Sequence, residues 1–158
     1  MKKKKDIGMI LFISLLFLEF NLTAYDINLA QKFNETFSQY SQKYLNNSKM
    51  LVSSDEILKM LQKKEKFILL DIRTPAEMQI IGLRTENTLE IPFNQLFKKD
   101  KLDKLPIDKP IIVVCHSGSR ALQAATNLII LGFKNTKVLH GGIIALAKSN
   151  STRNAPIK

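Results

Sequence analysis

The sequence predicts an α/β domain of three layers, in which helices flank a mainly parallel five-stranded sheet, preceded by an extra N-terminal helix. Two short apolar runs rich in branched side chains, 67–72 and 111–115, are typical of strands that are buried on both faces of a parallel sheet. Segments with helical patterns alternate with these and other strand candidates, as they do in parallel α/β domains. The length of 158 residues suits one such domain with an appendage, because domains usually run to about 100–150 residues.

Each element follows from a local pattern. Ser53 with Glu56 three residues later has the spacing of a capping box, which opens a helix. Gly132 is a helix C-cap after a strong helical pattern. The expected elements in chain order are a strand at 50–52, a helix to about Gln62, a strand at 67–72, a helix after Pro75, a strand at 89–91, a turn of helix from Pro92 to Phe97, a strand at 111–115, a helix at 120–131, a strand at 138–139 and a helix from Gly141-Gly142 to about Lys148.

Residues 1–24 have the pattern of a secretory signal peptide. A basic cluster at 2–5 precedes an apolar stretch at 7–18, and Ala24 is a small residue at which a signal peptidase could cut. Twelve helical residues rise only about 18 Å, which is too short to cross a hydrocarbon core of about 30 Å comfortably. We therefore expect a periplasmic or otherwise exported protein. The alternative is an inner-membrane anchor formed by an uncleaved leader.

The rest of the chain divides into an N-terminal helix with a linker (25–49), the α/β domain (50–149) and a polar C-terminal tail (150–158). In the first of these segments, Phe33, Phe37, Tyr40 and Tyr44 recur at spacings that place them on one face of a helix within 26–47. This aromatic face could dock on the domain, bind a protein partner or rest on a membrane surface.

The composition excludes several classes of function. The chain has 24 Lys and Arg against 14 Asp and Glu, a formal charge of +10, but the excess lysines are scattered beside acidic residues. We expect no nucleic-acid partner, because such binding would need a basic stripe with exposed aromatics or a reading motif. The single cysteine rules out a disulfide scaffold and a cysteine-rich zinc fold.

That cysteine stands where ligand sites of open α/β sheets lie, at the carboxyl end of a buried strand. It begins the loop Cys115-His116-Ser117-Gly118-Ser119-Arg120. Small residues let backbone N–H groups turn inward around the sulfur, the next helix adds the positive end of its dipole, and Arg120 adds a permanent cation. These effects favour the thiolate and predict a nucleophilic Cys115. The alternative is a small buried cysteine that merely closes the strand.

Several motifs in this order and spacing resemble the rhodanese family of sulfurtransferases, over about Met50 to Lys148. They are Cys115-x-Ser117-Gly118-x-Arg120, Asp71-Ile72-Arg73-Thr74-Pro75-Ala76-Glu77, Glu90-Ile91-Pro92 and Leu139-x-Gly141-Gly142. With its leader, the chain is similar to the small periplasmic rhodaneses of Gram-negative bacteria. Two positions depart from the family pattern, since Ile81-Gly82-Leu83 stands for Gly-His-Ile and Leu146 for a tryptophan.

The resemblance implies the rhodanese fold and a two-step sulfur transfer that requires no metal or cofactor. The Cys115 thiolate attacks the outer sulfur of a small anionic donor such as thiosulfate, and a thiol or cyanide acceptor then removes the sulfur from the Cys115 persulfide. The N–H groups from His116 to Arg120 stabilise the persulfide anion, and Arg120 holds the loop or orients the donor. Asp71 and Arg73 are expected behind the site or in a folding role, and the spacing of Glu77 would let it pair with Arg73.

Two other functions share this fold. Related phosphatases and arsenate reductases have one more residue between the cysteine and the arginine, which widens the loop for a tetrahedral oxyanion, whereas four residues intervene here. A sulfur-carrier or partner-binding module would use the aromatic face of the N-terminal helix. Purely binding modules of this kind often lack the cysteine that this sequence retains.

Overall fold

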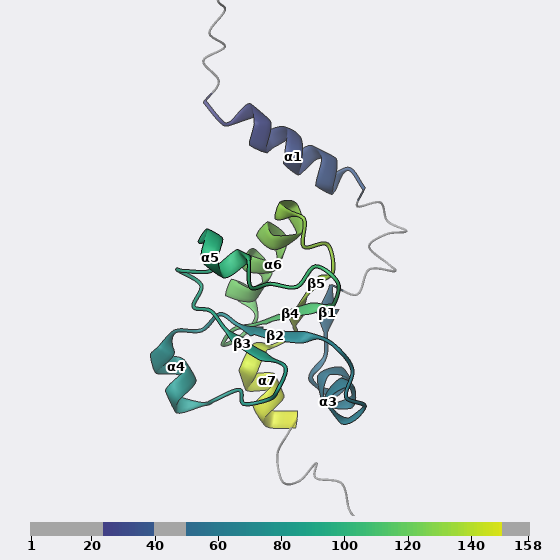
Figure 1. Cartoon of the computed structure of the whole chain (residues 1–158), viewed down its shortest axis with the longest axis vertical. Helices are drawn as coiled ribbons and strands as arrows, with labels where there is room; N and C mark the ends of the chain where they lie inside the picture. Colours follow the sequence, from purple (N-terminus) through teal and green to yellow (C-terminus); the bar gives the residue numbers. More distant parts are fainter. Residues whose placement is uncertain (1–23, 40–49, 150–158) are drawn as a thin grey trace, which may run out of the picture.

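A computed structural model describes residues 24–39 and 50–149 (Figure 1). Within these residues, five strands form one sheet in the order β1-β5-β4-β2-β3, and every pairing is parallel. The strands are β1 (Leu51–Val52), β2 (Ile68–Asp71), β3 (Thr88–Glu90), β4 (Ile111–Val114) and β5 (Thr136–Leu139). The predicted α/β fold with a parallel five-stranded sheet is confirmed.

Helices cover both faces of this sheet (Figure 1). The helices of the described residues are α1 (Ile27–Phe37), which lies beyond α6 and away from the sheet, α3 (Ser54–Gln62), α4 (Pro75–Ile80), α5 (Lys99–Leu102), α6 (Ser119–Leu131) and α7 (Gly142–Ser149). The helices α3 and α7 pack on one face, and α5 and α6 on the other, so that the sheet separates two apolar clusters. Burial on both faces explains why the strand sequences are continuously apolar rather than alternating.

The central strand β4 determines which way the cysteine points. Successive side chains of a strand face opposite sides of the sheet. Ile112 and Val114 belong to the cluster beneath α3 and α7, whereas Ile111, Val113 and Cys115 belong to the cluster beneath α6. The alternation therefore directs the Cys115 side chain toward α6.

Local capping interactions explain where the helices begin and end. The Ser53 hydroxyl accepts the N–H of Glu56 at 3.2 Å and caps α3. Thr74 and Glu77 form a complete capping box at the start of α4. Gly132 ends α6 with a φ of 113°, a conformation that costs glycine little, so the predicted C-cap is confirmed.

The segment between β3 and β4 differs from the sequence prediction. The turn of helix expected from Pro92 to Phe97 is a run of turns, closed by i to i+3 hydrogen bonds such as that from the Gln95 N–H to the Pro92 carbonyl at 2.8 Å. A four-residue helix that was not predicted, α5, follows at Lys99–Leu102. So short a helix has too few apolar positions to establish a period, and the packing of Leu102 against the core is visible only in the fold.

The N-terminal helix α1 contacts α6, and it has no buried residue. Asp26 caps it by accepting the Leu29 N–H at 3.0 Å. The Phe33 and Phe37 rings stack with their centroids 6.1 Å apart and stay more than a third exposed. The helix ends at Phe37 in the described residues, whereas the sequence predicted it within 26–47. Tyr40, Tyr44, residues 1–23 of the expected leader (1–24) and the tail (150–158) lie outside the described residues.

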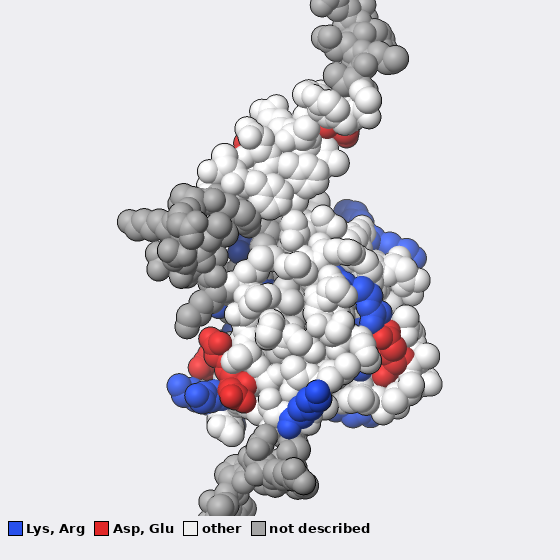
Figure 2. Space-filling model, turned by 180° about the vertical axis from the view of Figure 1, so that it is seen from behind, with Lys and Arg blue, Asp and Glu red and all other residues white. Residues whose placement is uncertain are grey.

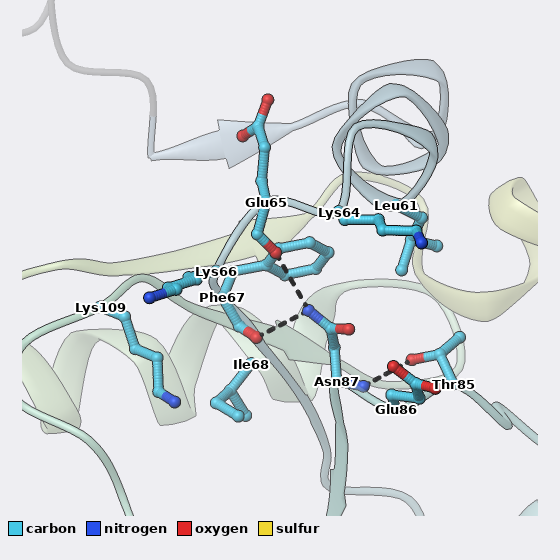
Figure 3. Close-up of a pocket in the computed structure, with 10 residues that line it drawn as sticks. All are labelled: Leu61, Lys64, Glu65, Lys66, Phe67, Ile68, Thr85, Glu86, Asn87 and Lys109. Atoms are coloured by element: carbon cyan, nitrogen blue, oxygen red, sulfur yellow. Dashed lines mark hydrogen bonds between the residues drawn. The ribbon is translucent and has the colours of Figure 1, made fainter.

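A hollow of about 590 Å³ lies at the amino-terminal edge of the sheet, where β2, β3 and β4 begin (Figure 3). The Asn87 side chain crosses it and donates its amide N–H groups to the carbonyls of Phe67, at 3.0 Å, and Glu65, at 3.3 Å. Ligand sites of parallel sheets lie at the carboxyl ends of the strands. The geometry thus gives this hollow a structural role, in which Asn87 ties β3 to the segment that precedes β2.

Charges are dispersed over the face of the molecule drawn in Figure 2. On that face, Lys and Arg side chains lie in separate small groups, some of them beside Asp or Glu. The lysine excess of the sequence does not form a continuous stripe there. Among the helices of the described part, none is both long and apolar enough to cross a membrane.

Candidate active site

Cys115 directly follows β4 and is fully buried. Its Sγ accepts the backbone N–H of Gly118 at 3.1 Å and that of Ala121 at 3.4 Å. The sequence predicted that N–H groups between His116 and Arg120 surround the sulfur. The structure assigns that contact to Gly118, and it adds Ala121, which lies one residue beyond the predicted loop.

These two donors belong to the N-terminus of α6. Gly118 is the N-cap residue of that helix and Ala121 is the third residue of its first turn. The first N–H groups of a helix have no partner within it, and a side chain at the N-cap usually accepts one of them. Gly118 has no side chain, and the sulfur of Cys115 occupies the position of the capping acceptor. Negative charge on this sulfur meets both the free N–H groups and the positive end of the helix dipole.

Gly118 permits this arrangement through its backbone. Its φ is 109°, a region that side-chain-bearing residues rarely adopt, and an added Cβ would meet nothing closer than 3.6 Å. The need for glycine here is therefore conformational rather than steric. His116, Ser117 and Ser119 are exposed along the same loop, whereas the Gly118 N–H is directed at the sulfur.

Arg120 forms a bidentate ion pair with Glu77 of α4. Nη1 of Arg120 donates to Oε2 of Glu77 at 3.0 Å, and Nη2 donates to Oε1 at 2.5 Å. The Arg120 guanidinium, together with the N–H of Thr74, lowers the pKa of Glu77 from 4.5 to about 2. The carboxylate of Glu77, and to a smaller extent the sulfur of Cys115, raise the pKa of Arg120.

Asp71 and Arg73 form a second ion pair, which is completely buried behind the first. Arg73 donates Nε to both carboxylate oxygens of Asp71, at 2.9 and 3.1 Å, and Nη2 to Oδ2 at 2.6 Å. The expected pairing of the Glu77 carboxylate with Arg73 is wrong. Arg73 donates instead to the backbone carbonyl of Glu77 at 3.4 Å, because the capping box turns the carboxylate toward Arg120. A contact between residues 43 positions apart leaves no local signal in the sequence.

The start of α7 supports the loop from the other side. The N–H groups of Ile143 and Ile144 donate to the carbonyls of Cys115, at 2.9 Å, and His116, at 3.4 Å. A Cβ added to Gly142 would come within 2.5 Å of both of these carbonyl oxygens. The sequence marked the Gly141-Gly142 pair as part of a motif, but its contact with the cysteine appears only in the structure.

The sheet order explains why these segments meet. From β2 the chain continues to β3 on one side, and from β4 it continues to β5 on the other. The carboxyl ends of β2 and β4 therefore flank the point where the strand order reverses, which is the usual ligand site of such sheets. The Asp71–Arg73 segment follows β2 and the Cys115 loop follows β4. In the part of the chain that the structure describes, no group of three or more His, Cys, Asp or Glu is placed to hold a metal ion.

The fold and site define an α/β protein in which a buried cysteine lies at a helix N-terminus. Residues 53–149, more than half of the chain, match the family model described as "Rhodanese-like domain". The chain belongs to this family, as the sequence motifs predicted.

Known relatives include sulfurtransferases. The chain is 31% identical over 105 residues to a sulfurtransferase of Allochromatium vinosum, a match that covers 66% of this chain and 94% of that protein. It is 30% identical to the probable adenylyltransferase/sulfurtransferase MoeZ of Mycobacterium tuberculosis and 29% identical to the tRNA uridine(34) hydroxylase of Pectobacterium atrosepticum. These two matches cover 61% and 58% of this chain, but only 24% and 26% of those longer proteins.

Solved structures agree with the fold. A rhodanese-related protein of Thermoplasma volcanium is 28% identical with a TM-score of 0.53, and the match covers 63% of this chain and 91% of that one. The single-domain sulfurtransferase RDL2 of Saccharomyces cerevisiae has a TM-score of 0.55 at 22% identity, over 70% of this chain and 98% of that one. At 22% identity, the similarity to RDL2 shows a shared fold and nothing more.

A methyl group at Gly142 is expected to disrupt the site. In Gly142→Ala, the Cβ would clash with the Cys115 and His116 carbonyls, and a displacement of the loop by about 1 Å can cost about 100-fold in rate. Gly132→Ala is the matched control, because Gly132 also has a positive φ but nothing within 4 Å of its added Cβ. The rate of Cys115 alkylation by iodoacetamide should fall in Gly142→Ala and stay unchanged in Gly132→Ala. Equal rates in the two variants would contradict this account.

The Glu77–Arg120 ion pair should make stability depend on pH in the acid range. Because the pKa of Glu77 is lowered from 4.5 to about 2, its contribution to the free energy of unfolding is fully present above pH 4.5 and is lost as the pH falls toward 2. Urea unfolding should show Glu77→Gln less stable than wild type by about 1 kcal/mol above pH 5, and the difference should shrink below pH 4.5. The control is Glu86→Gln, an exposed carboxylate at the far edge of the sheet. If the difference in stability between wild type and Glu77→Gln persists unchanged to pH 2.5, the stabilisation does not come from the ionised Glu77 carboxylate.

Proposed function

We propose that this protein transfers sulfane sulfur from a small anionic donor such as thiosulfate to a thiol or cyanide, through a persulfide on Cys115. The observation that carries the proposal is the position of the Cys115 sulfur. It is buried at the N-terminus of α6 and accepts hydrogen bonds from two backbone N–H groups. A nucleophilic thiolate needs this kind of stabilisation. Membership of a family with sulfurtransferase relatives supports the same reaction class.

In the first step, the Cys115 thiolate attacks the outer sulfur of thiosulfate. A new S–S bond forms to Cys115, the S–S bond of thiosulfate breaks, and the electron pair leaves with sulfite. The product is the Cys115 persulfide anion. Backbone N–H groups at the N-terminus of α6 would stabilise this charge as the donors of an oxyanion hole do, without reorganisation during the reaction.

In the second step, a thiolate or cyanide attacks the outer sulfur of the persulfide. The S–S bond breaks, the electron pair returns to Cys115 as thiolate, and the acceptor leaves as a persulfide or as thiocyanate. The chemistry needs no group beyond the cysteine and its donors, so the protein's work is to stabilise anions and to shield them from water.

Two observations weigh against the competing functions. The four residues between Cys115 and Arg120 make a loop one residue shorter than the phosphatase and arsenate reductase kind. A purely partner-binding module would not need the sulfur at a helix N-terminus. A carrier that accepts sulfur only from a protein partner keeps the same site and differs only in its donor.

Persulfide formation is directly measurable. Purified protein incubated with thiosulfate should gain the mass of one sulfur atom, and cyanide should remove it with release of thiocyanate. Cys115→Ser should gain nothing, because an alcohol cannot replace the thiolate under these conditions. If wild type gains no sulfur from thiosulfate or from a low-molecular-weight persulfide, the proposal fails. A gain that Cys115→Ser retains would also rule out Cys115 as the sulfur carrier.

We further propose that the chain is exported, on the strength of the basic and apolar pattern of residues 1–24. Expression of the full chain in a Gram-negative host, followed by fractionation and N-terminal sequencing, tests this. Protein that begins near Tyr25 in the periplasmic fraction is the expected result. An intact Met1 in the membrane fraction would support an anchor instead, and an intact Met1 in the cytoplasm would exclude export.

A further inference from the structure

We propose that a hollow between α3, α7 and the segment that follows α4 binds a medium-chain aliphatic carboxylate. This hollow, called the α3–α7 hollow below, has a volume of about 420 Å³. It lies against the apolar cluster beneath α3 and α7, whereas the Cys115 side chain belongs to the cluster on the other face of the sheet. The proposal is therefore independent of sulfur transfer and goes beyond it.

The lining of the hollow comes from three parts of the chain. The helices α3 and α7 contact each other, and the segment 81–85, between α4 and β3, completes the hollow (Figure 1). The lining side chains of the two helices are all aliphatic, namely Leu58, Leu61, Ile143, Leu146 and Ala147. In the segment, Leu83 is buried and Ile81 is 42% exposed. Sites for small molecules have volumes of about 300–1,000 Å³ and mostly apolar walls, so this hollow suits a small ligand with an aliphatic body.

The hollow also has one cationic group. Among the described residues, the side chain of Arg84 is the charged one that lines it, and no carboxylate does. Arg84 is exposed, and no ion pair of the described part of the chain includes it. Glu90 shares a neighbouring hollow with Arg84, but the two form no ion pair. The Arg84 guanidinium is therefore available for the carboxylate of a ligand, which it can bind through two parallel N–H groups.

Gly82 lets the Arg84 side chain lie close to the backbone of this segment. A Cβ added to Gly82 would stand 3.0 Å from Nε and 3.5 Å from Cγ of Arg84, so a side chain at this position would displace the guanidinium. Gly82 and Leu146 are also positions at which the sequence departs from the family pattern, and both line the hollow. An indole at position 146 would take up space that leucine leaves open.

The two parts of the lining match the two parts of an aliphatic carboxylate. Its hydrocarbon chain would contact the leucine and isoleucine side chains, and its headgroup would bind Arg84. A peptide C-terminus also carries a carboxylate, but its amide groups would need hydrogen-bond partners. Arg84 and Thr85 are the polar side chains of the lining, and the Thr85 hydroxyl already bonds to that of Thr88 at 3.0 Å. The lining therefore favours an aliphatic chain over a peptide.

The test titrates the isotope-labelled full chain with octanoate and follows the backbone amide resonances. We expect saturable shifts at 81–85 and 143–147, which line the hollow or lie next to it, and none on α5. Each added methylene, from hexanoate through octanoate to decanoate, should tighten binding about two- to fourfold, because more apolar surface leaves water.

A variant of Arg84 separates the headgroup from the chain. Arg84→Gln should weaken octanoate binding about fivefold, since an ion pair at an exposed site contributes modestly. Binding of octanol, which has the same chain length and no charge, should stay unchanged. If Arg84→Gln weakens octanol as much as octanoate, the guanidinium does not bind the headgroup and the proposal is wrong.

Two adjacent isoleucines provide a matched pair of variants. Ile81→Glu removes an apolar group from the lining and adds a like charge, so it should weaken octanoate binding about tenfold. Ile80→Glu makes the same change one residue earlier, at a side chain that is 82% exposed and does not line the hollow, and should stay within about twofold of wild type. Leu146→Trp should also weaken binding by filling the hollow. If that variant folds poorly, the two exposed isoleucines still decide.

Three further results would overturn the proposal. They are the absence of saturable shifts at 81–85 with octanoate, an equal loss of affinity in Ile80→Glu and Ile81→Glu, and shifts confined to α1, whose phenylalanine rings are exposed. Cys115→Ser should bind octanoate as the wild type does. A failure of the proposed sulfur transfer would therefore leave this test intact, and the two failures are distinguishable.

Discussion

The site depends on one interaction, the capping of α6 by the sulfur of Cys115. The helix begins at Ser119, five residues after the last strand residue Val114, and Gly118 leaves its N-terminus without a side-chain cap. The sulfur supplies the acceptor, and the helix supplies N–H donors to the sulfur. The same contact thus satisfies a structural need of the helix and prepares the thiol for anionic chemistry. Successive side chains of β4 face opposite sides of the sheet, and this alternation directs the Cys115 side chain toward α6. The direction of the sulfur is therefore determined by the strand that precedes it.

The other elements of the site hold this contact in place from two directions. The first turn of α7 bonds to the carbonyls of Cys115 and His116, and Gly142 makes room for them. On the opposite side, α4 presents Glu77 to Arg120. The reactive loop is therefore supported through both its carbonyl groups and its charged side chain.

Sequence reasoning was reliable where a local pattern carries the information. The apolar runs of β2 and β4, the caps at Ser53 and Gly132, and the placement of Cys115 at the end of a strand were all predicted. It failed where tertiary contacts decide, as in α5, whose four residues take their place from packing. It also failed for Glu77, since helical spacing pointed to Arg73 four residues before it.

By itself, the sequence determined the fold class, the order of the strands and the position of Cys115 at the end of a strand. These depend on periodicity, capping residues and a loop motif, which are all properties of neighbouring residues. Only the tertiary structure decided that Glu77 binds Arg120, that Gly142 lies against the Cys115 carbonyl and that Ala121 donates to the sulfur. The first contact joins α4 to α6 and exists only after the parallel sheet has brought the carboxyl ends of β2 and β4 side by side, and the second requires the pairing of β4 with β5. A pattern of neighbouring residues cannot predict such contacts, because each depends on how two helices or strands are placed relative to each other, and the packing of the core determines that placement.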